Sequence, residues 1–196
     1  MWITWKHQDT QLSWPLTFEQ KVDLFYEQAL GWQLHIADLV ANGGTPFGER
    51  KTIMPIRHSG FVVLQICLSY FETIGHYMGK AGGSRAAFRS GVFEVFPELA
   101  DLDPAIVNSA VDALYSDARC GLYHNTRTAR VVLAQPTGGA AVAYDLTIQR
   151  VVISPEHLPR VLKAHLERFR TALLDEGNRE LRARFESRFD QDTGTA

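Results

Sequence analysis

Residues 60–78 read GFVVLQICLSYFETIGHYM, and this stretch decides the fold. It is apolar almost all round, which is typical of a helix at the centre of a core. Its few polar side chains are spaced by four, three, one and three positions and therefore form one narrow stripe along the helix. The stripe consists of Gln65, Ser69, Glu72, Thr73 and His76. These interruptions make the stretch a poor membrane span, so we expect a mainly α-helical bundle built around it.

A second helix is predicted over residues 17–40. Thr17 and Gln20 have the spacing of a capping box at its start. Apolar residues then recur every three or four positions and predict one buried seam. The seam consists of Phe18, Val22, Phe25, Ala29, Trp32, Ile36 and Leu39. Gly43 and Gly44 end this helix and begin a long loop.

The rest of the chain predicts four more helices and one pair of strands. Ser84 would cap a third helix, and Asp103 would cap a fourth. The buried side of the fourth helix is expected to consist of Val107, Val111, Leu114 and Ala118. Residues 129–153 are rich in β-branched residues around a Pro-Thr-Gly-Gly turn, which indicates an inserted β-hairpin. Two helices follow between residues 154 and 190, and their eight basic and seven acidic residues predict a solvated, salt-bridged surface.

Length and composition indicate one domain at residues 17–190, with a Trp-rich arm at 1–16 and a disordered tail at 191–196. The formal net charge of -2 provides no global field that favours nucleic acid or an acidic membrane. Cys67 and Cys120 predict free thiols in a reducing compartment. The N-terminus lacks the basic start and the apolar run of a signal peptide, so a cytoplasmic protein is expected.

The segment from Arg119 to His124 places an arginine and a histidine five positions apart, where the fourth predicted helix ends. Cleavage of RNA without a metal requires removal of a proton from a ribose 2′-hydroxyl and stabilisation of charge on the phosphorus. Histidine suits the first task because its ordinary pKa lies near neutral pH. Arginine suits the second because its planar, charged fork matches phosphate oxygens.

This segment resembles the signature of the HEPN family, a group of helical-bundle proteins that includes metal-independent endoribonucleases. The signature is an arginine, four to six residues and a histidine at or near a helix end, and Arg119 and His124 match it. The resemblance covers about residues 17–125. It implies RNA cleavage without a cofactor to a 2′,3′-cyclic phosphate and a 5′-hydroxyl, and a homodimer in which two motifs meet. It also implies an acidic residue on a neighbouring core helix, which Glu72 would supply, whereas Cys120 stands where many active members have Asn or His.

Several neighbours of the motif are predicted helpers. Tyr123 would stack a base, while Asn125 and Arg127, followed by Arg130, would donate hydrogen bonds to phosphate. Alternatively, these residues form a polar loop and an exposed strand edge. Asp117, two positions before the arginine, is expected to face solvent.

Other interpretations of the same residues stay open. Arg119 would simply cap a helix C-terminus, with His124 as a hydrogen-bonded turn residue. The protein would then be a non-catalytic HEPN-like binding or assembly module, with the hairpin and terminal helices as the surface for a protein partner such as an antitoxin. Glu72 and His76 would bind a metal only with a third ligand, which the spacing does not supply. A Cys120–His124 hydrolase lacks an oxyanion-hole signature.

Overall fold

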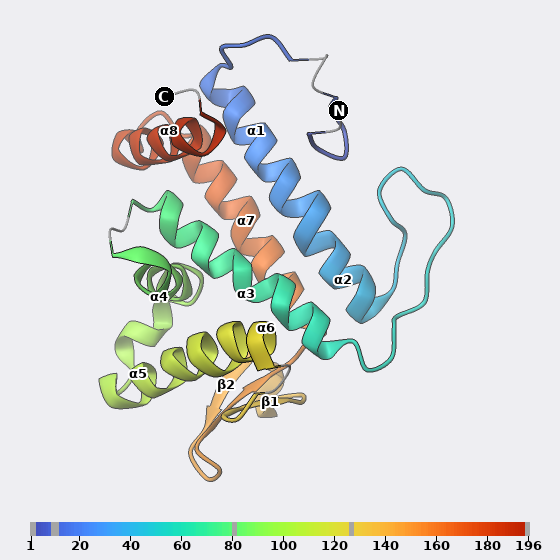
Figure 1. Ribbon diagram of the computed structural model, residues 1–196, viewed down its shortest axis with the longest axis vertical. Helices are drawn as coiled ribbons and strands as arrows, with labels where there is room; N and C mark the ends of the chain where they lie inside the picture. The colour runs from blue at the N-terminus through green and yellow to red at the C-terminus, as the bar shows by residue number, and fades with distance from the viewer. Residues whose placement is uncertain (1–2, 9–11, 80–81, 126–127, 195–196) are drawn as a thin grey trace.

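The computed structural model describes residues 3–8, 12–79, 82–125 and 128–194, and it shows a mainly helical fold with a small sheet (Figure 1). The α-helices are α1 (Phe18–Ala29), α2 (His35–Asn42), α3 (Gly60–Tyr77), α4 (Gly83–Val95), α5 (Pro104–Asp112), α6 (Gly121–Asn125), α7 (Leu158–Leu174) and α8 (Arg179–Thr193). Two π-helical stretches, η2 (Leu30–Leu34) and η4 (Ala113–Cys120), and two 3₁₀ turns, η3 (Pro97–Asp101) and η5 (Thr137–Gly139), complete the helical segments. The strands are β1 (Val131–Leu133), β2 (Val142–Asp145) and β3 (Arg150–Ile153). Across the described residues, no helix is both long enough and apolar enough to cross a bilayer.

Helix α3 is the central helix, as the sequence predicts. Most of its side chains are buried, and α2, α4, α7, α8 and η4 all contact it. The closest of these contacts is with α4, where glycines let the two backbones meet. A Cβ on Gly75 would lie 1.7 Å from the carbonyl oxygen of Ala87, and one on Gly91 would lie 1.8 Å from that of Phe71. Any side chain at either glycine would therefore separate the two helices.

The long first helix begins and ends as predicted. Gln20 donates its backbone N–H to the Thr17 hydroxyl and accepts the Thr17 N–H on its side chain, which confirms the capping box. Helix α2 ends at Asn42, and Gly43 follows with a φ of 71°, a conformation that glycine adopts without steric cost.

The predicted seam of this helix is wrong at Trp32 and Ile36, whereas Leu39 is buried as predicted. Trp32 and Ile36 are 48% and 41% exposed, whereas Leu34 and Ala37 are fully buried. The cause is η2, in which hydrogen bonds run from residue i to i+5 rather than i+4. The residue that continues the buried face after Ala29 is therefore five positions on, at Leu34.

The remaining helix ends agree with the sequence in part. Asp103 caps α5 by accepting the Ala105 N–H at 2.8 Å, as predicted. Ser84 is not a cap, because α4 begins at Gly83 after a left-handed Gly82. Helix α8 continues through Thr193, so the first residues of the expected tail are helical.

The predicted hairpin lies within residues 129–153 but joins different strands from those expected. Strands β2 and β3 form the antiparallel hairpin, and β1 pairs with β3 in parallel, which gives the order β1-β3-β2. The hairpin turn forms because Asp145 accepts the backbone N–H groups of Thr147 and Ile148. Val151 and Ile153 on the central strand are buried and attach the sheet to the helices.

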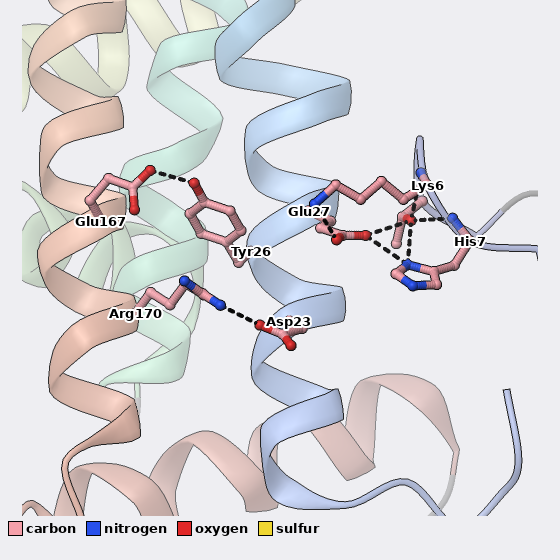
Figure 2. Close-up of polar contacts among 8 residues, drawn as sticks. Lys6, His7, Asp23, Tyr26, Glu27, Glu167 and Arg170 are labelled. Carbon is pink, nitrogen blue, oxygen red and sulfur yellow. Dashed lines mark hydrogen bonds and ion pairs between the residues drawn. The ribbon is translucent and has the colours of Figure 1, made fainter. Parts of the chain in front are cut away.

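The N-terminal arm is attached to α1 through one buried carboxylate (Figure 2). Glu27 accepts the Thr4 hydroxyl at 2.9 Å and contacts Lys6 at 2.9 Å and His7 at 2.8 Å. Burial opposes ionisation of Glu27, but the hydrogen bonds from Lys6, Thr4 and His7 and the Lys6 charge outweigh it and hold its pKa below the ordinary range. The arm therefore depends on the ionised form of Glu27.

Polar contacts also join α1 to α7 on the far side of Glu27 (Figure 2). Asp23 accepts a hydrogen bond from Arg170 at 2.7 Å, and Tyr26 donates its hydroxyl to Glu167. These contacts lie at the surface of the bundle and cover its apolar interior.

Candidate functional site

The Arg119–His124 segment lies on one continuous helical path. Arg119 belongs to η4, and His124 belongs to α6, which follows η4 without a break and extends to Asn125. The helix therefore continues past Arg119, and the interpretation of this residue as a C-terminal cap is wrong. Figure 1 shows this path running beside α3.

The Arg119 guanidinium is directed at α3, where it pairs with Glu72. Its Nη2 and Nε lie 3.3 and 3.4 Å from the Glu72 Oε2. The two side chains are 32% and 16% exposed, so the pair is shielded but reachable from solvent. Glu72, the candidate acidic helper on a neighbouring core helix, therefore contacts Arg119.

Glu72 has a second cationic neighbour on its own helix. Its Oε1 lies 3.9 Å from Nε2 of His76, one helical turn further along α3. The carboxylate thus lies between the Arg119 guanidinium and the His76 imidazole.

The predicted polar stripe on α3 is accessible along its whole length. Gln65 is exposed, and Ser69, Glu72, Thr73 and His76 are half-buried, while the residues between them face the core. The Ser69 and Thr73 hydroxyls donate to backbone carbonyls of their own helix. A shallow depression of about 300 Å³ lies over the stripe and is lined by Gln65, Ile66, Ser69 and Arg119.

His124 is exposed at the last turn of α6. Of the predicted helpers, Arg127 lies outside the described residues, and so do the side chains of Tyr123 and Asn125. Cys120, next to Arg119, is a half-buried free thiol, whereas Cys67 is a buried one whose pKa is raised by desolvation.

Arg130 and Asp117 have a structural role that the sequence did not suggest. Asp117 is largely covered and accepts hydrogen bonds from the Arg130 Nε at 2.7 Å, Nη2 at 3.1 Å and backbone N–H at 3.0 Å. The expectation of a solvent-facing Asp117 is therefore wrong. Arg130 lowers the pKa of Asp117, mainly through the side-chain hydrogen bond, and the pair attaches the start of β1 to η4.

Two functional candidates on α8 were missed by the sequence reasoning. Arg184 and Arg188 lie with His76 around a hollow of about 460 Å³ at the end of α3. Their spacing of four positions was a signal, because it puts both on one helix face. Their position opposite α3 follows only from the packing of α8.

Within the described ranges, no three His, Cys, Asp or Glu side chains lie close enough together to hold a metal ion. Comparison with family models, curated proteins and solved structures finds no match. The likeness to the HEPN family therefore stays a prediction that depends on the motif residues and their setting.

Proposed function

We propose that this protein is a metal-independent endoribonuclease of the HEPN type, with Arg119 and His124 acting on the scissile phosphodiester. The observation that supports the proposal is the Arg119–Glu72 ion pair, at 3.3 Å, in which Arg119 also lines the open depression on α3. A guanidinium oriented by a carboxylate but reachable from solvent is suited to bind a phosphate oxygen. His124 follows on the same helical path and is exposed to the same solvent.

The proposed reaction needs only groups of the RNA and of this chain, together with water. His124 takes the proton of the 2′-hydroxyl, and the 2′-oxygen attacks phosphorus as its bond to the 5′-oxygen breaks. Arg119 stabilises the negative charge that builds up on the non-bridging oxygens. Water protonates the departing 5′-oxygen, and the products are a 2′,3′-cyclic phosphate and a 5′-hydroxyl.

Glu72 is a positioning residue in this proposal. It holds the guanidinium of Arg119 over the stripe and does not itself contact the phosphate, which would repel it. Its own charge is balanced by Arg119 and His76, so the depression does not present a bare carboxylate to the RNA.

We further propose that the protein works in the cytoplasm as a homodimer that brings two motifs together. Phe61 and Val62, one turn before Gln65 on α3, are exposed apolar side chains beside the depression, and a second copy of the chain would bury them. Phe61→Glu should then convert a dimer to a monomer in size-exclusion chromatography with light scattering. Leu146→Glu, at the exposed hairpin turn, should leave the mass unchanged, and a monomeric wild-type chain would contradict the dimer.

The nuclease is tested by RNA cleavage in the presence of a chelator. Arg119→Ala and His124→Ala should each lower the cleavage rate by at least about 100-fold, the lower end of what a positioned acid–base group contributes. Arg85→Ala is the matched control, since Arg85 forms a 3.0 Å ion pair with Asp112 away from the stripe. Circular dichroism verifies that each variant is folded.

Two outcomes would reject this function. Cleavage that survives both substitutions would come from another site or a contaminant. RNA that stays intact with folded wild-type protein would favour the non-catalytic binding module, in which case affinity should not change with Arg119→Ala or His124→Ala.

A further inference from the structure

A hollow at the end of α3 opens next to the polar stripe. Helix α8 packs across this end of α3 (Figure 1), and the space between them is about 460 Å³. It is lined by His76 and Gly79 at the end of α3 and by Arg184, Ser187, Arg188 and Gln191 of α8. No acidic side chain is among the described residues that line it.

Two of the acidic residues of helix α8 lie away from the hollow. Glu186 and Asp190 face α1, where each lies 2.8 Å from the Lys21 ammonium group. Arg184 and Arg188 face the hollow at the end of α3. The two arginines share their helix face with Glu180 and Asp192, each one turn away.

The acidic partners of the two arginines are easily exchanged. Glu180 lies 3.2 Å from Arg184 and Asp192 lies 2.9 Å from Arg188, each one turn away along α8. Both carboxylates are exposed, and exposed pairs of this kind contribute little free energy. A phosphate that enters the hollow would displace them at small cost and gain the bidentate contacts that arginine forms with phosphate.

The stripe on α3 connects this hollow to the candidate active site. From Gln65 to His76 it covers 11 residue steps, or about 16 Å along the helix axis. Arg119 lies over its middle, and His76 belongs both to the stripe and to the lining of the hollow. The stripe is one side chain wide, which fits a single strand better than a duplex.

We infer that the α3–α8 hollow is a phosphate-binding subsite for the single-stranded RNA that flanks the scissile bond. This inference rests on the proposed nuclease function. Arg184 and Arg188 bind backbone phosphates, Ser187 and Gln191 supply further donors, and the strand follows the stripe from the hollow to Arg119. A basic groove that tracks the backbone is the usual way to hold a single strand without reading its sequence.

The test measures binding of a 12-nucleotide 2′-O-methyl RNA by fluorescence anisotropy at several salt concentrations. This probe has no 2′-hydroxyl and is not cleaved by the proposed reaction. Arg184→Ala/Arg188→Ala should bind about tenfold more weakly at 0.1 M salt. The slope of log affinity against log salt should become less steep by about 1.4, or about 0.7 for each phosphate lost.

A matched control comes from α4. Arg85→Ala/Arg89→Ala removes two arginines with the same four-residue spacing and polar partners of their own, Asp112 and Asn108. It should leave both affinity and salt slope unchanged. Arg184→Lys/Arg188→Lys should keep most of the salt slope, which separates loss of charge from loss of fold.

Three outcomes would overturn the inference: equal binding by wild type and the Arg184→Ala/Arg188→Ala variant, equal losses in the α4 control, or no measurable binding by wild type. Cleavage of a dinucleotide, which is too short to reach the hollow, should be unaffected by Arg184→Ala/Arg188→Ala. Loss of oligonucleotide binding with unchanged dinucleotide cleavage supports the subsite. Binding that depends on the two arginines without any cleavage would reject the nuclease and keep the hollow as a nucleic-acid site.

Discussion

Substitution of Gly91 by alanine tests the central contact of the fold. The added Cβ would lie 1.8 Å from the carbonyl oxygen of Phe71, about half the 3.4 Å at which ordinary contact begins. It would also lie 2.6 Å from the Phe71 carbonyl carbon. Both groups are helix backbone, so no side chain can rotate away, and α3 and α4 have to move apart.

The expected loss follows from two opposing effects. Overpacking a core by one methylene costs about 1–3 kcal/mol when side chains adjust, and here rigid backbone on both sides raises the cost above that range. Alanine regains about 1 kcal/mol over glycine in a helix. We expect the free energy of unfolding to fall by about 3 kcal/mol. For a chain of this length, that corresponds to a melting temperature lower by about 6–12 °C.

Urea unfolding followed by circular dichroism measures this loss. Gly177→Ala is the control, because its Cβ would meet only the Asp175 side chain, at 3.1 Å, and it should change the free energy of unfolding by less than about 0.5 kcal/mol. If Gly91→Ala unfolds at the same urea concentration as wild type, the backbone contact between α3 and α4 is incorrect.

Three further outcomes are expected. Glu72→Gln should lower the rate of RNA cleavage about tenfold, because it releases the Arg119 guanidinium that Glu72 holds. Asp112→Asn, which breaks the Arg85 ion pair, should leave that rate unchanged. Equal cleavage rates for Glu72→Gln and wild type in steady-state kinetics would exclude the positioning role. Because the native pKa of Glu27 is lowered, its stabilisation is complete above its ordinary value of 4.5 and is lost as pH falls through the lower native value. Glu27→Gln should therefore lower the free energy of unfolding by about 1–2 kcal/mol at pH 7 and by less at pH 3; equal losses at both pH values in urea titrations would contradict this. Tyr70→Phe removes a buried 2.8 Å hydrogen bond to His165 Nδ1 and should cost about 1–2 kcal/mol; an unchanged urea midpoint would show that this bond adds nothing.

Features that depend on a few consecutive residues could be predicted from the sequence. The capping box of Thr17 and Gln20 and the Asp103 cap are local hydrogen bonds between residues two or three positions apart. The central position of α3 follows from its composition, since a helix that is apolar nearly all round has to be enclosed. The polar stripe follows from the same pattern, whereas the contact of Glu72 with Arg119 depends on how η4 packs against α3.

Features that depend on distant packing could not be predicted. The pairing of β1 with β3 joins strands separated by β2, and the β-branched composition of all three strands fits either order. The hollow at Arg184 and Arg188 exists only because α8 crosses the end of α3 with that face inward. The charges on α8 show which residues could pair, but they do not show which helix each face meets.

The π-helical stretch η2 explains the main error of the sequence reasoning. In η2, the i to i+5 bonding moves the buried face from Ala29 to Leu34 and turns Trp32 outward. Arg119 lies near the end of the second such stretch, η4, and its guanidinium contacts Glu72 of α3. π-helical stretches are rare and are frequent at functional sites, which makes η4 the stretch where the substitutions at Arg119 and Glu72 are most informative.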